Sequence, residues 1–245
     1  MAQTEKPQNI KSLVTALLEG IQNKTLADSK GKLPSEYQLM AQYQVSRYAL
    51  RQALSQLGDL GYIYQAQGIG SFVRPRRVNN ALAVQHNLGL TEEMARPGRT
   101  IRTVVASRRI IQAAEADFLP ENSEISLQTT LIEIKRLRTL DDEPYLTEQS
   151  YYLELIAKEI PDSALYDSVF DYIETKQKLK IGFIDKVISS EPLNTQGADF
   201  FQLPVGAPTL VVRDDTFLSA GKLLAFSKIC YDYRKAELFM FKKNY

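Results

Sequence analysis

The spacing of apolar positions predicts three short helices and a hairpin at the start of the chain. From residue 7 to residue 23 the apolar positions recur every three or four residues and define one helix face: Ile10, Leu13, Val14, Leu17, Leu18 and Ile21. A second helix is expected after Ser35, because Ser35 and Gln38 have the spacing of a capping box. This helix should end near Tyr43.

A third helix is expected to begin after Ser46, another good N-cap, and to end at Gly61. Its apolar side should be buried and consists of Leu50, Ala53, Leu54 and Leu57. Its other side is polar and consists of Arg47, Tyr48, Arg51, Gln52 and Ser55. Two arginines in the first turn and a half suit a DNA major groove, since arginine can bond guanine through two hydrogen bonds. In an isolated helix the same residues would form only a solvated face.

The segment after the third helix alternates as two strands, Tyr62–Ala66 and Ser71–Val73, around the tip Gln67-Gly68-Ile69-Gly70. Two helices, a sharp turn, a third helix and a glycine-containing hairpin are typical of a winged helix-turn-helix, which binds DNA. Glycine at the tip lets the backbone approach a phosphate or the minor groove, although an ordinary hairpin turn would also use it. Arginines 74, 76 and 77 follow and can meet phosphates.

Beyond residue 99 strands and helices alternate. Strands are expected at 101–111, 126–138, 144–152, 181–190, 210–218 and 223–233, with a possible edge strand at 239–241. Helices are expected at 113–118, 168–179 and 195–202, and a turn over residues 141–143 should close a hairpin. Several hairpins and few crossovers predict an antiparallel sheet flanked by helices, so the chain as a whole is α+β.

The charge of the chain is unevenly placed. The net charge is only +1 over 245 residues, but the first 78 residues carry +5 and the remainder −4. A basic head and a mildly acidic body fit a DNA-binding domain joined to a domain that does not bind DNA. We therefore expect a DNA-binding domain over residues 1–75, a linker over 76–98 with one short helix near 91–95, and a second domain over 99–245.

Residue counts exclude several kinds of site. The chain has one cysteine, Cys230, and one histidine, His86, so a cysteine or histidine metal centre and a Ser-His-Asp triad within one chain are not expected. We expect neither a metal nor a cofactor. No apolar run approaches the ~20 residues of a membrane span, and no signal peptide is visible, which predicts a cytoplasmic protein without a membrane partner.

Head and body together resemble the GntR family of bacterial repressors, in the HutC-type branch with a UTRA effector-binding domain. The residues that carry the resemblance in the head are LPSE at 33–36, VSR at 45–47 and GIGSFV at 68–73. In the body they are IKRLRTLDDEPYLTEQSYY at 134–152, SVFDYIE at 168–174 and QLPVGAP at 202–208. The resemblance implies a homodimer on a palindromic operator, released by a small molecule, and a body similar to the chorismate lyase fold.

The resemblance also implies which residues contact DNA. It assigns contacts to the positions of Tyr37, Arg47, Arg51 and Gly68. The caps Ser35 and Ser46, Tyr48 on the polar side of the third helix and Gly70 at the hairpin tip complete the expected DNA-binding residues. Family members carry an arginine where this chain has Tyr37. Because tyrosine cannot make the arginine contact, the operator bases or one phosphate contact should differ.

In phosphosugar-sensing relatives, two arginines spaced as RxR and a serine at a helix start hold the phosphate. The expected effector-binding residues here are Arg136, Arg138, Glu148, Ser168 and Tyr231. Two arginines at i and i+2 on a strand point to the same face, so one anion can engage both. The resemblance assigns Glu148 to sugar hydroxyls and Tyr231 to the pocket wall. Ala225 departs from an acidic residue frequent in relatives, which leaves the sugar open.

The same residues have structural alternatives. The arginine pair can simply form ion pairs on a sheet face, Glu148 can be a surface strand residue, and Tyr231 and Tyr233 can be packing residues. The leading hypothesis is a ligand-responsive repressor of carbohydrate uptake or breakdown genes. The alternative is an enzyme of the chorismate lyase type with a DNA-binding head, whose acid-base work would fall to Glu148 or a lysine. A ligand-free architectural DNA-binder is a third hypothesis.

Overall fold

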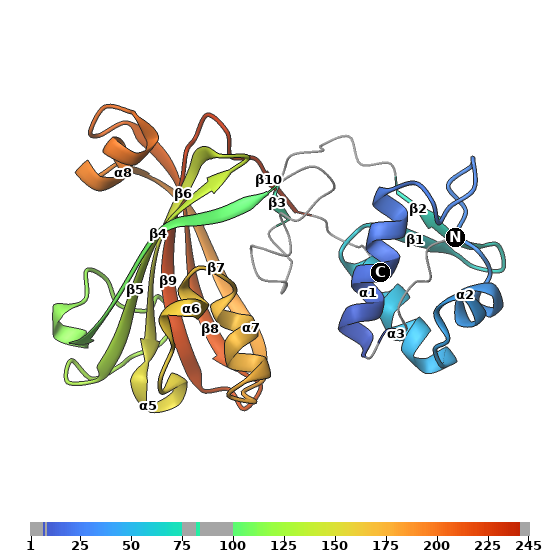
Figure 1. The fold of residues 1–245 in the computed structure, drawn as a ribbon, viewed down its shortest axis with the longest axis horizontal. Coiled ribbons are helices and arrows are strands. Elements are labelled where there is room, and N and C mark those ends of the chain that lie inside the picture. Colours follow the sequence, from blue (N-terminus) through green and yellow to red (C-terminus); the bar gives the residue numbers. More distant parts are fainter. Residues whose placement is uncertain (1–6, 8, 75–81, 84–99, 241–245) are drawn as a thin grey trace. The chain divides into compact units, whose positions relative to one another are not determined.

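The computed structural model describes residues 7, 9–74, 82–83 and 100–240. By its internal contacts the chain divides into two compact units, residues 1–86 with 237–245, and residues 87–236. Figure 1 shows the elements of both units. The predicted helix near 91–95, together with His86, Arg76 and Arg77, lies outside the described residues.

The first unit begins with three helices, each started by a side-chain cap. They are α1 (Ile10–Gln22), α2 (Glu36–Tyr43) and α3 (Arg47–Asp59). The caps are Asn9, Ser35 and Ser46, whose side chains accept hydrogen bonds from backbone N–H groups in the first turn. Gln44 ends α2 in the left-handed conformation, with φ of 52°, and this sharp reversal sets α3 against α2. The predicted capping box of Ser35 and Gln38 is confirmed.

A two-stranded hairpin completes the winged helix-turn-helix. Strand β1 (Ile63–Ala66) pairs with β2 (Gly70–Val73), and Tyr64 stacks on Phe72 across the pair. The predicted helix stripes form the core of this unit: Leu13, Val14, Leu17, Leu50, Ala53, Leu54 and Leu57 are all buried. Burial of these side chains positions the exposed side of α3 and the hairpin.

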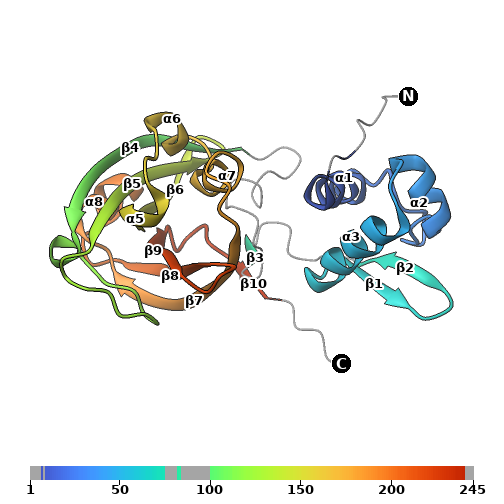
Figure 2. The same ribbon diagram turned by 90° about the horizontal axis from the view of Figure 1, so that it is seen from below.

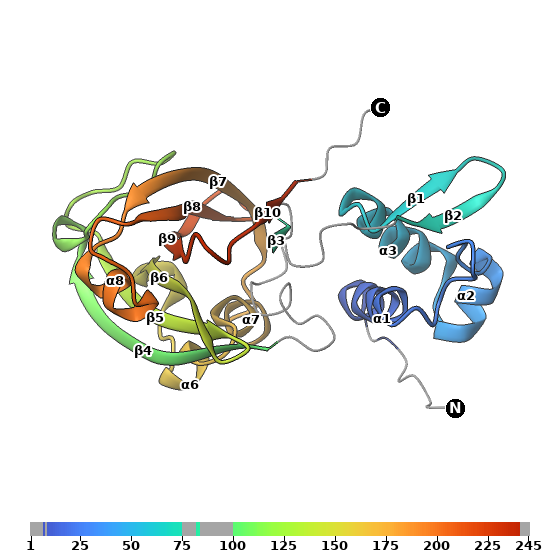
Figure 3. The same cartoon turned by 90° about the horizontal axis from the view of Figure 1, so that it is seen from above.

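The second unit is built on a six-stranded antiparallel sheet, which Figures 2 and 3 show as a strongly curved wall. Its spatial order is β4-β5-β6-β9-β8-β7. The strands are β4 (Ile101–Gln112), β5 (Thr130–Leu140), β6 (Glu143–Leu153), β9 (Leu223–Tyr231), β8 (Pro208–Leu218) and β7 (Ile181–Pro192). The predicted turn between β5 and β6 is confirmed, with Asp141 and Asp142 both at positive φ, as a two-residue hairpin requires.

The two faces of the sheet are covered differently. One face, here called the helix face, packs against three short helices: α5 (Glu154–Ala157), α6 (Asp162–Leu165) and α7 (Val169–Thr175). Ile132 and Ile134 of β5 point to this face and share its core with Val169 and Ile173. The other face, here called the loop face, carries the 3-10 turn η1 (Ala113–Glu115) and the segment after it, whose Phe118 packs on Tyr151.

Several element bounds differ from the prediction. Residues 113–115 form a single 3-10 turn rather than a helix to 118, and β5 starts at Thr130 rather than 126. Helix α7 ends at Thr175, four residues early, while α8 (Thr195–Phe201) lies where expected. Helices α5 and α6 were not predicted, because four-residue helices are too short to show a period.

The expected edge strand near 239–241 is not part of the large sheet. Instead, β10 (Leu238–Phe239) pairs in parallel with β3 (Leu82–Ala83) in a small sheet of its own. Among the described residues, no helix is long and apolar enough to cross a membrane.

Candidate functional site

The exposed side of α3 presents the predicted DNA-binding residues. Arg47 and Arg51 lie one turn apart, with side chains 65% and 58% exposed. Tyr48 is 71% exposed, and Tyr37 at the start of α2 is 81% exposed. Large aromatic side chains left this open are available for stacking or for contact with a base edge, because no packing role occupies them.

A carboxylate that the sequence analysis did not single out joins these arginines. Glu36, the first residue of α2, accepts hydrogen bonds from Arg47 Nε and Arg51 Nε, each at 3.1 Å. The hydrogen bond from Arg51, followed by that from Arg47, holds the pKa of Glu36 below its usual range. Glu36 therefore fixes both arginines side by side at the junction of the two helices.

The cap Ser35 and the hairpin glycines meet along one groove of this unit. Ser35, Gly68 and Gly70 line it together with Lys32, between the start of α2 and the hairpin tip. The φ angles of Gly68 and Gly70 are +74° and +133°, values that residues with a side chain rarely adopt. No heavy atom lies within 4 Å of a Cβ built on Gly68, so the tip is open on its outer side. Ser46 acts as the cap of α3 and accepts from Ala49 N at 3.2 Å.

In the second unit, Arg136 and Glu148 face each other across β5 and β6 on the helix face. Arg136 Nη2 donates to Glu148 Oε1 at 2.6 Å and Oε2 at 2.7 Å, and its Nε donates to Oε2 at 3.1 Å. Both side chains are less than a tenth exposed. The alternative that Glu148 is a surface strand residue is wrong, while the ion-pairing alternative for Arg136 describes this contact.

Arg138 lies on the same face, two residues along β5, and its Nη1 is 3.9 Å from Glu148 Oε2. It is 3% exposed, and burial lowers its pKa to about 10 even though Glu148 acts in the opposite direction. Tyr231 lies in the same cross-strand row, at 3% exposure, with its ring edge-on to that of Tyr145. Tyr233, by contrast, is half exposed.

Ser168 lies beside Arg136. It caps α7 by accepting from Asp171 N at 3.1 Å, and the carbonyl of the preceding Asp167 accepts from Arg136 Nη1, also at 3.1 Å. The structure thus brings four of the five predicted effector-binding residues into one cluster, Arg136, Arg138, Glu148 and Ser168, with Tyr231 in line with Arg138 across the strands.

The cluster has an excess of positive charge. Burial opposes ionisation of Glu148, but Arg136 and Arg138 outweigh it and keep the pKa of this carboxyl below its usual range. Glu148 is therefore a carboxylate near neutral pH and has no proton to donate as a general acid. Two guanidinium groups and one carboxylate leave a net charge of +1 among these three buried side chains.

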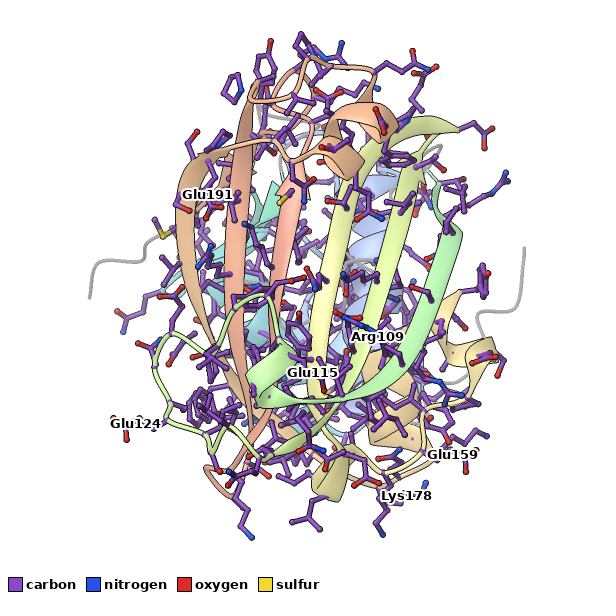
Figure 4. The ribbon with its side chains drawn as sticks, turned by 90° about the vertical axis from the view of Figure 1, so that its left-hand side faces the viewer. Arg109, Glu115, Glu124, Glu159, Lys178 and Glu191 are labelled. Atoms are coloured by element: carbon purple, nitrogen blue, oxygen red, sulfur yellow. The ribbon has the colours of Figure 1, made fainter. Side chains whose placement is uncertain are left out.

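The loop face has a cavity of its own, of about 310 Å³, and Figure 4 views the sheet from this side. Glu191, labelled there on β7, accepts from Arg213 Nη2 at 2.7 Å and also pairs with Lys228. Arg109, labelled toward the other edge of the sheet, pairs with the buried Glu133. These charged groups of the loop face form ion pairs with one another, as is typical of a network with a structural role. Among the described residues, no cluster could hold a metal ion.

Two family models together match most of the chain. The model of bacterial regulatory proteins of the gntR family matches residues 10–73, and the model of the UTRA domain matches residues 96–237. The gntR match spans the three helices and the hairpin, and the UTRA match spans the six-stranded sheet with its helices.

Similar proteins are found along nearly the whole length. The uncharacterized HTH-type transcriptional regulator YydK of Bacillus subtilis is 29% identical over 206 residues, covering 84% of this chain and 86% of that protein. Its crystal structure superimposes with a TM-score of 0.72 at 27% identity, covering 96% of this chain and 99% of that one. The HTH-type transcriptional repressor NagR of Bacillus subtilis is 28% identical, covering 81% of this chain and 80% of that protein.

A third relative is the probable fructoselysine utilization operon transcriptional repressor of Escherichia coli strain K12. It is 30% identical over 166 residues, covering 65% of this chain and 62% of that protein. The family and these relatives are transcription regulators and not enzymes, so the chorismate lyase alternative is wrong. The chain belongs to the gntR family of bacterial regulatory proteins and is a DNA-binding transcriptional regulator with a UTRA effector-binding domain.

Proposed function

We propose that the protein is a repressor of carbohydrate uptake or catabolism genes that a phosphorylated sugar releases from its operator. One observation carries the proposal: Arg136 and Arg138 are buried side by side with Glu148 on the helix face. An anionic ligand that reaches both guanidinium groups can accept charge-assisted hydrogen bonds from each of them, and such bonds are strong in buried surroundings.

The carboxylate of Glu148 lies against Arg136 at the position where an anion would bind. A phosphate group entering the cluster would replace this carboxylate and bond both arginines, with Ser168 beside it. Glu148 would then be free to accept hydrogen bonds from sugar hydroxyls. The exchange keeps Arg136 paired in both states, so binding need not leave a buried guanidinium without a counter-charge.

The carbohydrate part of the proposal has two supports. Glu148 and the aromatic ring of Tyr231 offer an acceptor and an apolar surface on the same sheet face, which suits a polyhydroxylated ring. In addition, one relative is described as a probable repressor of a fructoselysine utilization operon.

We further propose that the protein acts as a homodimer on a palindromic operator. The DNA-binding domain would comprise residues 1–75, the linker 76–98 and the effector-binding domain 99–245. The DNA contacts would be made by Ser35, Tyr37, Ser46, Arg47, Tyr48, Arg51, Gly68 and Gly70. Since an effector can shift an equilibrium only by binding two states unequally, the effector must bind the released dimer more tightly than the operator-bound dimer.

The direct test is a thermal-shift screen against sugar phosphates, free sugars and small organic acids, followed by operator binding with each hit. A ligand specific for the folded state raises the melting temperature by mass action. The test variant is Arg136→Ala and the matched control is Arg109→Ala, since Arg109 also pairs with a buried glutamate but on the loop face.

We expect a sugar phosphate to raise the melting temperature of the native protein and of Arg109→Ala, and to have no effect on Arg136→Ala. The same ligand should weaken operator binding. A response confined to non-anionic ligands, or one that Arg136→Ala retains, would contradict the proposal.

A further inference from the structure

A second buried carboxylate, Asp214, lies on the helix face at some distance from the arginine cluster. In the cross-strand register, Ser150 of β6 is opposite Ser227 of β9, and Ser227 is opposite Asp214 of β8. Residues opposite each other share a face, and Ser150 is two residues from Glu148, so all of these side chains point to the helix face. Lys186 of β7 completes the row.

Asp214 is only half satisfied in this position. Its Oδ2 accepts from Lys186 Nζ at 2.9 Å, whereas its Oδ1 is buried and has no hydrogen-bond partner in the structure. Asp214 is 9% exposed, and burial raises the pKa of its carboxyl although Lys186 acts against this. A buried acceptor without a donor is destabilising, so a group that supplies the donor is favoured there.

The side chains between the two carboxylates are small. Ser150 and Ser227, which separate Glu148 from Asp214, are among the smallest polar side chains, and Ser150 Oγ donates to Glu148 Oε1 at 3.0 Å. Ser227 is part-exposed and the Lys186 side chain is 24% exposed, which opens this end of the row to solvent. A ligand held at the arginine cluster can therefore extend along the row toward Asp214.

We propose that Asp214 is a specificity-determining residue of the effector site and that its Oδ1 accepts a hydrogen bond from a hydroxyl group of the effector. The inference rests on the proposed function, because it places the anionic group of the same ligand at Arg136 and Arg138. The backbones of Arg136 on β5 and Asp214 on β8 are three strands apart, which is roughly 14 Å at a strand spacing of about 4.8 Å. Because the long arginine side chain covers part of that distance, the remaining span fits a hexose phosphate or larger ester and exceeds the reach of a triose phosphate.

The test compares Asp214→Ala with Asp215→Ala by isothermal titration calorimetry on the full-length protein. Asp215 is the matched control because it is also buried and is adjacent, but it points to the loop face, where its Oδ2 accepts from Asn122 N at 2.7 Å. The probes are glucose, fructose, galactose and glucosamine 6-phosphates, with glycerol 3-phosphate and orthophosphate as short anions.

We expect Asp214→Ala to weaken the hexose phosphate that binds best by about ten-fold, the loss of one hydrogen bond to a charged acceptor. Binding of glycerol 3-phosphate and orthophosphate should stay unchanged, and Asp215→Ala should bind all probes as the native protein does. Deoxy analogues of the best ligand then identify the hydroxyl, since the correct analogue binds the native protein and Asp214→Ala equally weakly.

A second variant guards against a folding defect in Asp214→Ala. Ser227→Val places a bulkier, apolar side chain between the two carboxylates without changing any charge. It should lower the affinity for hexose phosphates and leave the affinity for orthophosphate unchanged. If both variants bind hexose phosphates normally while Arg136→Ala does not, the role of Asp214 is wrong and the proposed function stands. If the native protein binds none of the anions, both are wrong.

Discussion

The two units of the molecule each hold one glutamate between two arginines, in opposite surroundings. In the first unit Glu36 bonds Arg47 and Arg51, and all three side chains are between 37% and 65% exposed. In the second unit Glu148 bonds Arg136 and lies 3.9 Å from Arg138, and all three are less than a tenth exposed. Both clusters carry the same net charge of +1, so they differ in solvation and not in composition.

The difference indicates how each cluster can be opened. Exposed ion pairs contribute about 0–1 kcal/mol and are screened by salt, so the arginines of α3 can leave Glu36 for a DNA phosphate or base at little cost. A buried pair cannot be broken without a substitute anion, because the charges that remain would be desolvated. The exposed cluster is therefore suited to binding DNA, a polyanion whose sequence varies. The buried cluster is suited to one small ligand that carries its own negative charge.

The largest expected effect comes from removing the two carboxylates in parallel. Glu148→Gln removes the carboxylate that is bonded to the buried guanidinium group of Arg136, and we expect it to lower the free energy of unfolding by about 3–5 kcal/mol. Glu36→Gln should lower it by less than about 1 kcal/mol. Urea denaturation of both variants measures the contrast, and equal effects would mean that burial does not separate the clusters.

The next effect concerns operator binding. Arg51→Ala should weaken binding to the specific operator by about 1–3 kcal/mol, the value of a bidentate contact to a base. The control is Arg102→Ala, since Arg102 is similarly exposed at 63% but pairs with Asp142 at the β5–β6 turn of the second unit. Fluorescence anisotropy at one fixed salt concentration checks this, and similar losses in both variants would argue against a base contact by α3.

The pH dependence of stability offers a smaller test of the buried cluster. Because the pKa of Glu148 is lower in the folded protein than its ordinary value of 4.5, its contribution is present above pH 4.5. The contribution is lost as the pH falls through the folded-state pKa. The stability gap between the native protein and Glu148→Gln should therefore shrink below pH 4.5, by at most about 1.4 kcal/mol per pH unit. A constant gap from pH 7 to pH 3 would contradict the lowered pKa.

The smallest effect concerns non-specific DNA. Glu36→Gln removes one negative charge from beside Arg47 and Arg51, so the variant should bind random-sequence DNA a few-fold more tightly at low salt. The gain should disappear at high salt, because surface charges are screened there. An unchanged affinity at low salt would mean that Glu36 does not limit the charge that α3 presents.

The sequence predicts the first unit better than the second, for a physical reason. The stripes of α1 and α3 and the caps at Ser35 and Ser46 are local signals, and they place the three helices to within a few residues. The sheet depends on contacts between distant segments, so strand starts drift, as at Thr130, and short helices such as α5 and α6 give no period. The strand alternation still places Arg136 and Arg138 correctly on one face.

The sequence analysis did not foresee the contacts of Glu36 or the position of Asp214. Glu36 belongs to the LPSE motif, but it lies 11 residues from Arg47, and only the fold brings the two side chains together. Asp214 had a visible signal, because two adjacent acidic residues interrupt the apolar strand LVVRDDTFL. Because side chains alternate along a strand, the two acidic residues point to opposite faces of the sheet. A charged side chain on a covered face needs a partner of opposite charge or a functional role.

The pairing of β10 with β3 joins two segments that lie before and after the large sheet in the sequence. Hydrogen bonds between these two segments close the polypeptide into a ring that contains all six strands. A cut at residue 236 would leave the six strands paired as they are and would open this ring, so it separates the architecture of the sheet from the closure of its ends.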